Sequence, residues 1–156
     1  MYRAINIICE NRSLFIKTVR EKQANPTTTL IAMVDGINCE TKIDLLTEFS
    51  KALQFPEYFG CNWDAFDECV NDLSWINKKK IIIVLLDAQL LLRNQENDYK
   101  IFLETLHDIN ESLIKKEVII FHHVDLGQED ILEKRLEKIK CTHARVDIKD
   151  YFSRLS

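Results

Sequence analysis

Five carboxylates crowd one short stretch of this sequence, FPEYFGCNWDAFDECVNDL at residues 55–73. They belong to Glu57, Asp64, Asp67, Glu68 and Asp72. No lysine or arginine falls between Ala52 and Asn77, although the chain of 156 residues holds 21 of them. Carboxylates without intervening cations can take part in acid–base chemistry, attract a basic partner or simply face solvent.

A helix over residues 62–73 would separate the side chains of this stretch by type. At about 100° per residue, the polar side chains fall on one face and the apolar side chains fall on the other. The polar face holds Asp64, Asp67, Glu68, Asn71 and Asp72, and the apolar face holds Trp63, Ala65, Phe66, Cys69, Val70 and Leu73. Asn62 suits the N-terminal cap of this helix, and Gly60 suits a tight turn before it. We expect the apolar face to pack on the core.

A solvated helix face is the simpler interpretation of such a charge run. Solvated faces, however, usually carry a lysine or arginine four residues from an acid. Here Asp64 and Glu68 place like charges at that spacing, and Asp67 and Glu68 lie beyond the first turn, where the helix dipole favours acids little. A cationic partner would relieve this repulsion, and the residues alone leave both interpretations open.

Strands and helices alternate around the acidic stretch. Short apolar runs predict buried strands at residues 29–34, 81–86, 118–121 and 144–148, while residues 5–9 fit either an edge strand or the start of a helix. Helical periodicity marks residues 13–22, 41–53, 99–113 and 129–139, with Thr41 and Asp44 suiting a first turn and Ile131 expected to face inward. The predicted fold is α/β, a small, mostly parallel sheet packed with helices.

The composition is typical of a single intracellular domain formed by residues 1–156. Apolar residues make up 46% of the chain, and only 3 glycines and 2 prolines interrupt it. The net charge of −4 argues against free nucleic acid as a ligand of the whole surface. Five scattered cysteines indicate reduced thiols, and no signal peptide or membrane-spanning apolar run is evident. We therefore expect a cytoplasmic protein without membrane partners.

The run PEYFGCNWDAFDEC, residues 56–69, resembles the signature of the barstar family, intracellular inhibitors of barnase-type ribonucleases. That signature is a Pro-Glu-Tyr-aromatic-Gly turn, an Asn, a helix opening with Asp-Ala, and an acid with a Cys one turn later. It is present here without a gap. The resemblance implies that residues 29–123 form a barstar-like core, which residues 1–28 and 124–156 extend.

In the barstar family the motif loop and the following helix block the cationic active site of the ribonuclease. The resemblance therefore implies partner contacts from Tyr58, Phe59, Asn62, Asp64 and Glu68. Aligning Leu103, Leu106 and Ile109 with the apolar positions of the family's later helix adds Asp108. Three departures stand out: Asp67 replaces a Trp, Trp63 replaces a Leu, and Glu68 is one methylene longer than the usual Asp. Asp67, Asn71 and Asp72 complete the expected contact face. Tyr58 and Phe59 could equally cover the core, and Trp63 fits burial better than an interface.

The expected function is that of an immunity protein, which binds a basic ribonuclease toxin one to one without metal, cofactor or direct contact with nucleic acid. The alternative is a regulatory or adaptor module that binds another basic protein through the same face.

Catalysis has little support in the sequence. Cys61 or Cys69 with His122 and His123 could form a Cys–His pair, as in a small hydrolase, but no triad spacing supports it. Cys141 and His143 with the same two histidines could bind a metal, but their spacing is loose. We expect neither.

Overall fold

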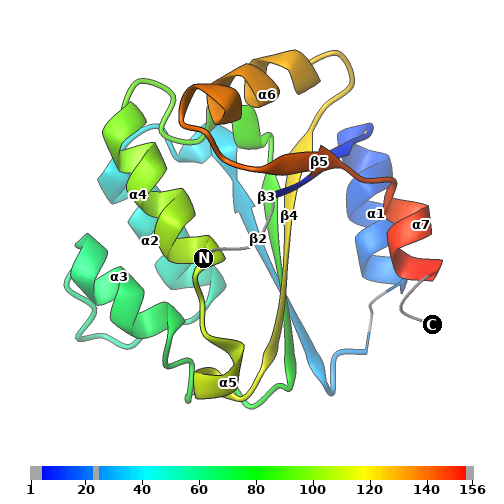
Figure 1. The fold of residues 1–156 in the computed structure, drawn as a ribbon. Helices are drawn as coiled ribbons and strands as arrows, with labels where there is room; N and C mark the ends of the chain where they lie inside the picture. Colours follow the sequence, from blue (N-terminus) through cyan, green and yellow to red (C-terminus); the bar gives the residue numbers. More distant parts are fainter. Residues whose placement is uncertain (1–4, 23–24, 154–156) are drawn as a thin grey trace.

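Five parallel strands form one sheet in the computed structural model, which describes residues 5–22 and 25–153 (Figure 1). The strands are β1 (Ile5–Cys9), β2 (Thr29–Asp35), β3 (Lys80–Leu86), β4 (Glu117–Val124) and β5 (His143–Arg145), in the order β2-β3-β4-β1-β5. The predicted α/β class and parallel sheet are confirmed. The range 5–9 is neither a helix nor an edge strand, because β1 lies between β4 and β5. The last predicted strand is shorter than expected, since a helix begins at Ile148.

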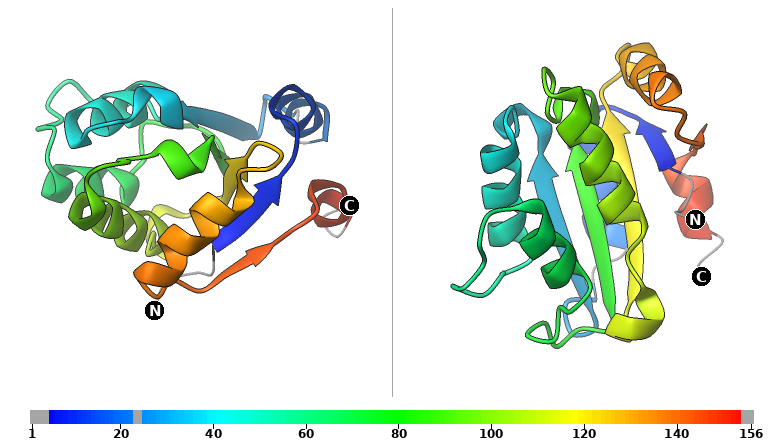
Figure 2. Two further views of the ribbon diagram at one scale, coloured as in Figure 1. Left: turned by 90° about the horizontal axis from the view of Figure 1, so that it is seen from above. Right: turned by 60° about the vertical axis from the view of Figure 1, so that its left-hand side comes forward.

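Helices cover both faces of the sheet (Figure 2). They are α1 (Arg12–Lys22), α2 (Lys42–Ala52), α3 (Trp63–Val70), α4 (Glu96–His107), α5 (Glu111–Ile114), α6 (Glu129–Lys138) and α7 (Ile148–Ser153), with 3-10 turns at Gly36–Asn38 and Ala88–Leu90. Residues of α2 to α6 pack in the core on one face, and residues of α1 and α7 pack on the other. No helix in the described part of the chain is long and apolar enough to cross a membrane.

Strand β3 supplies side chains to both cores. Its residues Ile81, Ile83 and Leu85 join the core under α2 to α6, whereas Ile82, Val84 and Leu86 join the core under α1. Successive side chains of a strand point to opposite faces. A strand between two helical layers must therefore be apolar at every position, which explains the unbroken run that marked it in the sequence.

The prediction of one helix at 99–113 is wrong in its extent, because two helices, α4 and α5, occupy this range. Asp108 caps the C-terminal end of α4, and Asn110 caps the start of α5 by accepting a hydrogen bond from the Leu113 backbone N–H at 3.1 Å. An asparagine competes with the helix by bonding to nearby backbone groups, and so favours a cap. The break leaves Leu113 64% exposed.

Several local expectations have clear outcomes. Thr41 and Asp44, which were expected to suit a first turn, form an N-terminal capping box at the start of α2. Ile131 on α6 was expected to face inward but is 52% exposed, so that prediction is wrong. The tight turn before α3 has its left-handed residue at Cys61 (φ 49°) rather than at Gly60. Gly36 is needed for space, because a Cβ there would lie 2.3 Å from the Asp87 carbonyl oxygen.

Two buried histidines, His107 at the end of α4 and His122 on β4, contact each other. The Nε2 atoms of His107 and His122 lie 2.8 Å apart, and their rings stack with centroids 5.0 Å apart. A hydrogen bond between the two Nε2 atoms needs one protonated and one bare nitrogen. Burial, and then the charge that His107 would carry, lower the pKa of His122 well below its ordinary value.

We expect this burial to make stability depend on pH. Below about pH 6.5, the unfolded chain protonates His122 but the folded chain does not, so the free energy of unfolding should fall as pH falls, by up to about 1.4 kcal/mol per pH unit. The stability that the neutral, buried His122 contributes is fully present above pH 6.5. His122→Asn removes the titrating group, so its unfolding free energy should fall less between pH 6.5 and 5. Denaturant unfolding at several pH values measures both slopes, and equal slopes would contradict the assignment.

Candidate partner-binding site

Helix α3 is held in place by its apolar face. Asn62 accepts a hydrogen bond from the Ala65 backbone N–H at 2.8 Å, which confirms its predicted role as the N-terminal cap. Phe66, Cys69 and Val70 are buried, and the Phe66 ring meets that of Phe49 edge-on at 5.3 Å. The opposite face is therefore left to solvent, as the helical pattern predicted.

The acids of this stretch keep their charge uncompensated. Asp64, Asp67, Glu68 and Asp72 are all exposed, and none pairs with a lysine or arginine in the part of the chain that the structure describes. Asp72 lies past the end of α3, where it accepts a hydrogen bond from the Ser74 backbone N–H, so its placement on the helix was wrong. Internal cations do not relieve the repulsion among these carboxylates.

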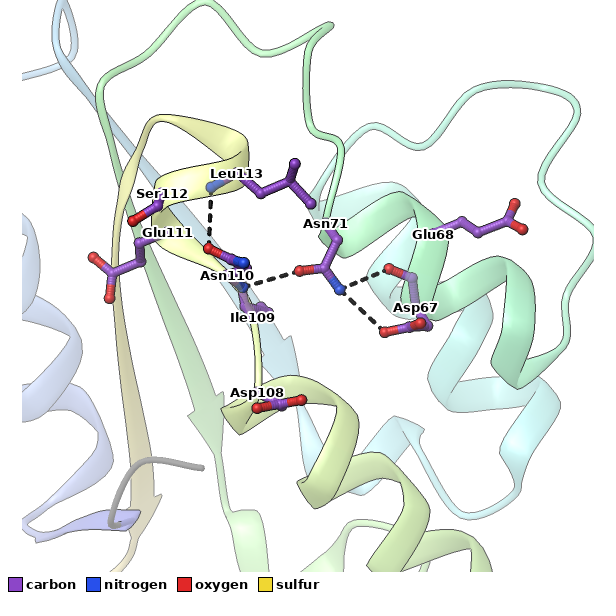
Figure 3. A pocket seen from close by; sticks show the side chains of 9 residues that line it. All are labelled: Asp67, Glu68, Asn71, Asp108, Ile109, Asn110, Glu111, Ser112 and Leu113. Carbon is purple, nitrogen blue, oxygen red and sulfur yellow. Dashed lines mark hydrogen bonds between the residues drawn. The ribbon is translucent and has the colours of Figure 1, made fainter. Parts of the chain in front are cut away.

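Four acidic residues line an open groove, and one of them, Glu111, begins α5 (Figure 3). Asp67 and Glu68 come from α3, and Asp108 comes from the end of α4, about forty positions later in the sequence. The groove has a volume of about 790 Å³, and Asn71 and residues 109–113 complete its lining. The fold thus brings Asp108 into the same groove lining as Asp67 and Glu68. We call this feature the acidic groove.

Asn71 and Asn110 determine the shape of the acidic groove. The Asn71 side chain donates to the Asp67 carboxylate at 3.0 Å and accepts from the Asn110 backbone N–H at 2.9 Å (Figure 3). This amide links α3 to the segment between α4 and α5, so its hydrogen bonds are already used within the chain. Sequence reasoning missed Asn110, although an asparagine just before Glu111 is the signal of a helix cap.

The remaining predicted contact residues lie at the other end of α3. Tyr58 is 78% exposed, whereas Phe59 packs on the core with its ring 4.8 Å from that of Phe55. Tyr58 is therefore free to contact a partner, and Phe59 covers the core. Asp64 lies in the first turn of the helix, outside the groove lining. Trp63 is half-buried, and its indole N–H donates to Asp98 at 2.9 Å.

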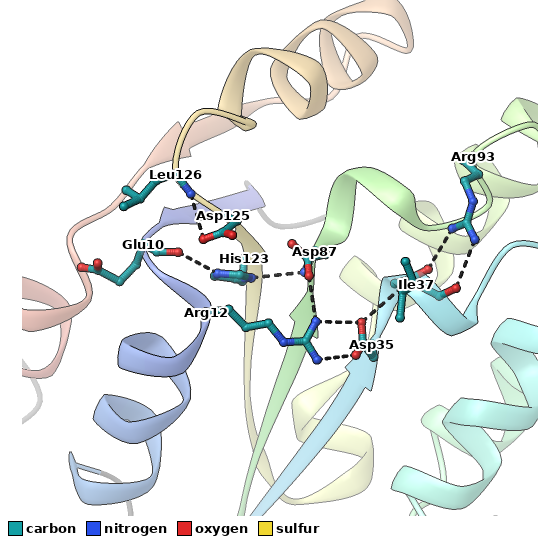
Figure 4. Close-up of polar contacts among 10 residues, drawn as sticks. Glu10, Arg12, Asp35, Ile37, Asp87, Arg93, His123, Asp125 and Leu126 are labelled. Carbon is teal, nitrogen blue, oxygen red and sulfur yellow. Dashed lines mark hydrogen bonds and ion pairs between the residues drawn. The ribbon is translucent and has the colours of Figure 1, made fainter.

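A second polar cluster lies at the carboxyl ends of the strands (Figure 4). Arg12, at the start of α1, bonds both oxygens of Asp35 and reaches Asp87 at 2.7 Å. Burial raises the pKa of Asp35, but hydrogen bonds from Arg12 and the Ile37 amide and the charge of Arg12 outweigh it, so this pKa is lowered. Ligands of parallel sheets usually bind at this edge. Here the single guanidinium of Arg12 already pairs with both acids.

His123 belongs to the same cluster and has both ring nitrogens engaged. Its Nδ1 lies 3.2 Å from the Asp87 backbone N–H, and its Nε2 lies 2.9 Å from the Glu10 carbonyl oxygen. A neutral ring that accepts at Nδ1 and donates at Nε2 satisfies both contacts. Burial lowers the pKa of His123, which agrees with the neutral form.

The structure adds no support to the catalytic and metal-binding sets weighed from the sequence. Burial, and the nearby charges of Asp72 and Glu68, raise the pKa of the Cys69 thiol, which opposes a nucleophilic thiolate. His122 bonds to His107 rather than to a cysteine. Among the described residues, the group that could hold a metal is Glu133, Glu137 and His143, which is not the predicted set. An arginine, Arg145, already pairs with Glu133 in that group.

Comparison with known families decides the classification. A family model described as Barstar (barnase inhibitor) matches residues 29–125. The chain belongs to the barstar family. The match confirms the resemblance carried by residues 56–69. Barstar-type features therefore lie in β2 to β4 and the helices between them. No curated protein matches the chain significantly.

Solved structures resemble the chain over nearly its whole length. ORC2 of Aeropyrum pernix in its ADP form is 12% identical with a TM-score of 0.62, covering 99% of this chain and 47% of that chain. Cdc6p of Pyrobaculum aerophilum is 11% identical with a TM-score of 0.57, covering 93% of this chain and 39% of that chain. This chain spans less than half the length of these proteins. At such identities the likeness shows the fold alone.

The ion pairs of Arg12 lead to a stability prediction. Arg12→Met would leave the half-buried carboxylates of Asp35 and Asp87 facing each other without a cation. We expect the free energy of unfolding at pH 7 to fall by about 1–3 kcal/mol, less than for a fully buried pair because solvent reaches these groups. Lys17→Met, which removes an exposed pair with Glu21 on the same helix, should change it by less than about 0.5 kcal/mol. Denaturant unfolding compares the two, and equal losses would contradict the role of Arg12.

Proposed function

We propose that this barstar-family protein inhibits a ribonuclease by placing the acidic groove and the exposed acids of α3 in the active site of the enzyme. The observation that carries the proposal is that Asp67, Glu68 and Asp108 line one open groove, and that none of the three pairs with a lysine or arginine among the described residues. The family description as a barnase inhibitor supports the same conclusion. The complex would contain one copy of each protein.

The chemistry of RNA cleavage explains why carboxylates suit this role. A ribonuclease must gather arginine, lysine and histidine around the scissile phosphate, so its cleft is positively charged. Carboxylates at matching positions occupy the places of phosphate oxygens and exclude the substrate. Glu68, at the family position that enters the phosphate site, would reach deepest, and Asp67 and Asp108 would contact further basic residues of the cleft.

Residues at the other end of α3 would widen the contact. Tyr58 offers an exposed ring beside the acidic helix, and such rings are common at the centre of interfaces. Asp64, Asn62 and Asp72 would face basic residues at the rim of the cleft, while Phe59 and Asn71 would support the surface from below. An inhibitor of this kind would act in the cytoplasm, as an immunity protein against a toxin that could destroy the RNA of its own cell.

Removing single charges tests the groove. Glu68→Gln and Asp108→Asn keep side-chain shape but leave enzyme cations unpaired, so each should weaken binding by about 2–5 kcal/mol, with Asp64→Asn at the lower end. Glu137→Gln, an exposed acid on α6, is the matched control and should leave affinity unchanged. Titration calorimetry with the cognate ribonuclease measures each constant. Undiminished binding by Glu68→Gln and Asp108→Asn together would refute the proposed face.

Salt dependence tests the electrostatic mechanism separately. Charge complementarity accelerates encounter, and ions screen it over about 8 Å at physiological ionic strength. The association rate with a ribonuclease should therefore fall steeply between low and high salt, while the dissociation rate changes less. Stopped-flow kinetics provide the measurement. If the same groove captured a basic protein without ribonuclease activity instead, the adaptor alternative would replace inhibition.

A further inference from the structure

A hollow lined mostly by lysines lies at the amino-terminal edge of the sheet. Its lining is Thr27, Thr28, Asn77, Lys78, Lys79, Lys115 and Lys116, and its volume is about 290 Å³. We call it the lysine pocket. The two lysine clusters are far apart in sequence, but parallel pairing of β3 with β4 places Lys80 beside Glu117 and brings both clusters to one edge.

Two of these lysines are held in fixed positions by backbone carbonyls. Lys116 Nζ donates to the carbonyl oxygens of Ile76 at 2.7 Å and Lys78 at 3.0 Å. Lys78 Nζ donates to the carbonyl oxygens of Pro26 and Thr27. An ammonium group has three N–H donors, so each lysine keeps one donor unused. Because carbonyls are neutral, both positive charges remain uncompensated.

Five further side chains of the lysine pocket are uncommitted. Lys79, Lys115, Thr27, Thr28 and Asn77 make no side-chain hydrogen bond or ion pair with any residue that the structure describes. The lining itself contains no acidic residue. Four lysines, two hydroxyls and an amide therefore converge on an open space where like charges repel.

We propose that the lysine pocket binds a phosphate group. Phosphate oxygens accept hydrogen bonds from ammonium, hydroxyl and amide donors, and their negative charge would relieve the repulsion among the lysines. The two lysines fixed by carbonyls lose little side-chain freedom on binding, which lowers the entropic cost. This site is separate from the acidic groove and does not depend on ribonuclease inhibition. The phosphate would belong either to a small phosphorylated molecule or to an RNA backbone.

The net charge of −4 does not oppose this site. That value averages over the whole surface, whereas a phosphate group responds to charges within about 8–10 Å. Four of the seven residues that line the lysine pocket are lysines, and the acidic groove shares no lining residue with it. The two sites therefore attract groups of opposite charge on one molecule.

Titration of the whole chain with inorganic phosphate tests the proposal. Backbone amide signals of Thr27, Thr28 and Asn77 should shift and saturate in NMR spectra. Lys79→Gln/Lys115→Gln removes two ammonium groups with no other contact, and should weaken phosphate binding about tenfold. Lys134→Gln/Lys138→Gln on α6 removes the same charge from an exposed helix and should leave binding unchanged. Thermal unfolding checks that both double variants are folded.

A second titration separates the two sources of phosphate. A short single-stranded RNA that binds more tightly than phosphate and is displaced by it would indicate an RNA backbone, whereas weaker RNA binding would indicate a small ligand. Both results support the site. Absence of saturable shifts in the unmodified chain, or equal weakening in the two double variants, would overturn it. If Lys79→Gln/Lys115→Gln fails to fold, the single variants Lys79→Gln and Lys115→Gln provide the same comparison.

Discussion

The burial of β3 on both faces is the constraint on which the rest of this structure depends. Each residue from Ile81 to Leu86 enters one of two cores, so helices must cover both sides of the sheet. The chain segments just before and after β3 contribute α3 and α4 to the same face. The acidic groove exists because these two helices are neighbours there, and the lysine pocket exists because β3 and β4 begin at one edge.

The protein contains carboxylates in two contrasting environments. Asp35 and Asp87 are half-buried at the carboxyl ends of β2 and β3, and they share the guanidinium of Arg12. A desolvated carboxylate needs such a partner, because burial of an unpaired charge is costly. The carboxylates of the acidic groove are solvated instead and tolerate one another without a cation. Solvation keeps their charge available to a partner, whereas the Arg12 cluster serves to join α1 to the sheet.

The acidic groove is also shaped before any partner arrives. Asn71 bonds to α3 on one side and to the Asn110 backbone on the other, and Asn110 in turn caps α5. These bonds keep Asp67 and Asp108 on facing walls of the groove. A site whose geometry is fixed in the free protein loses less conformational entropy on binding. The face that we propose for binding is therefore already formed in the free protein.

The sequence by itself determined the α/β class, the buried strands at β2 to β4, the capped start of α3 and the acidic face. All of these depend on local periodicity and on caps, which reach only a few residues along the chain. Tertiary structure alone decided that β1 lies inside the sheet, that the range 99–113 breaks at Asp108, and that Ile131 faces solvent. It also decided that Asp108 and Glu68 line one groove and that distant lysines share one pocket. Contacts between residues far apart in sequence depend on which strands pair, and no local pattern encodes that pairing.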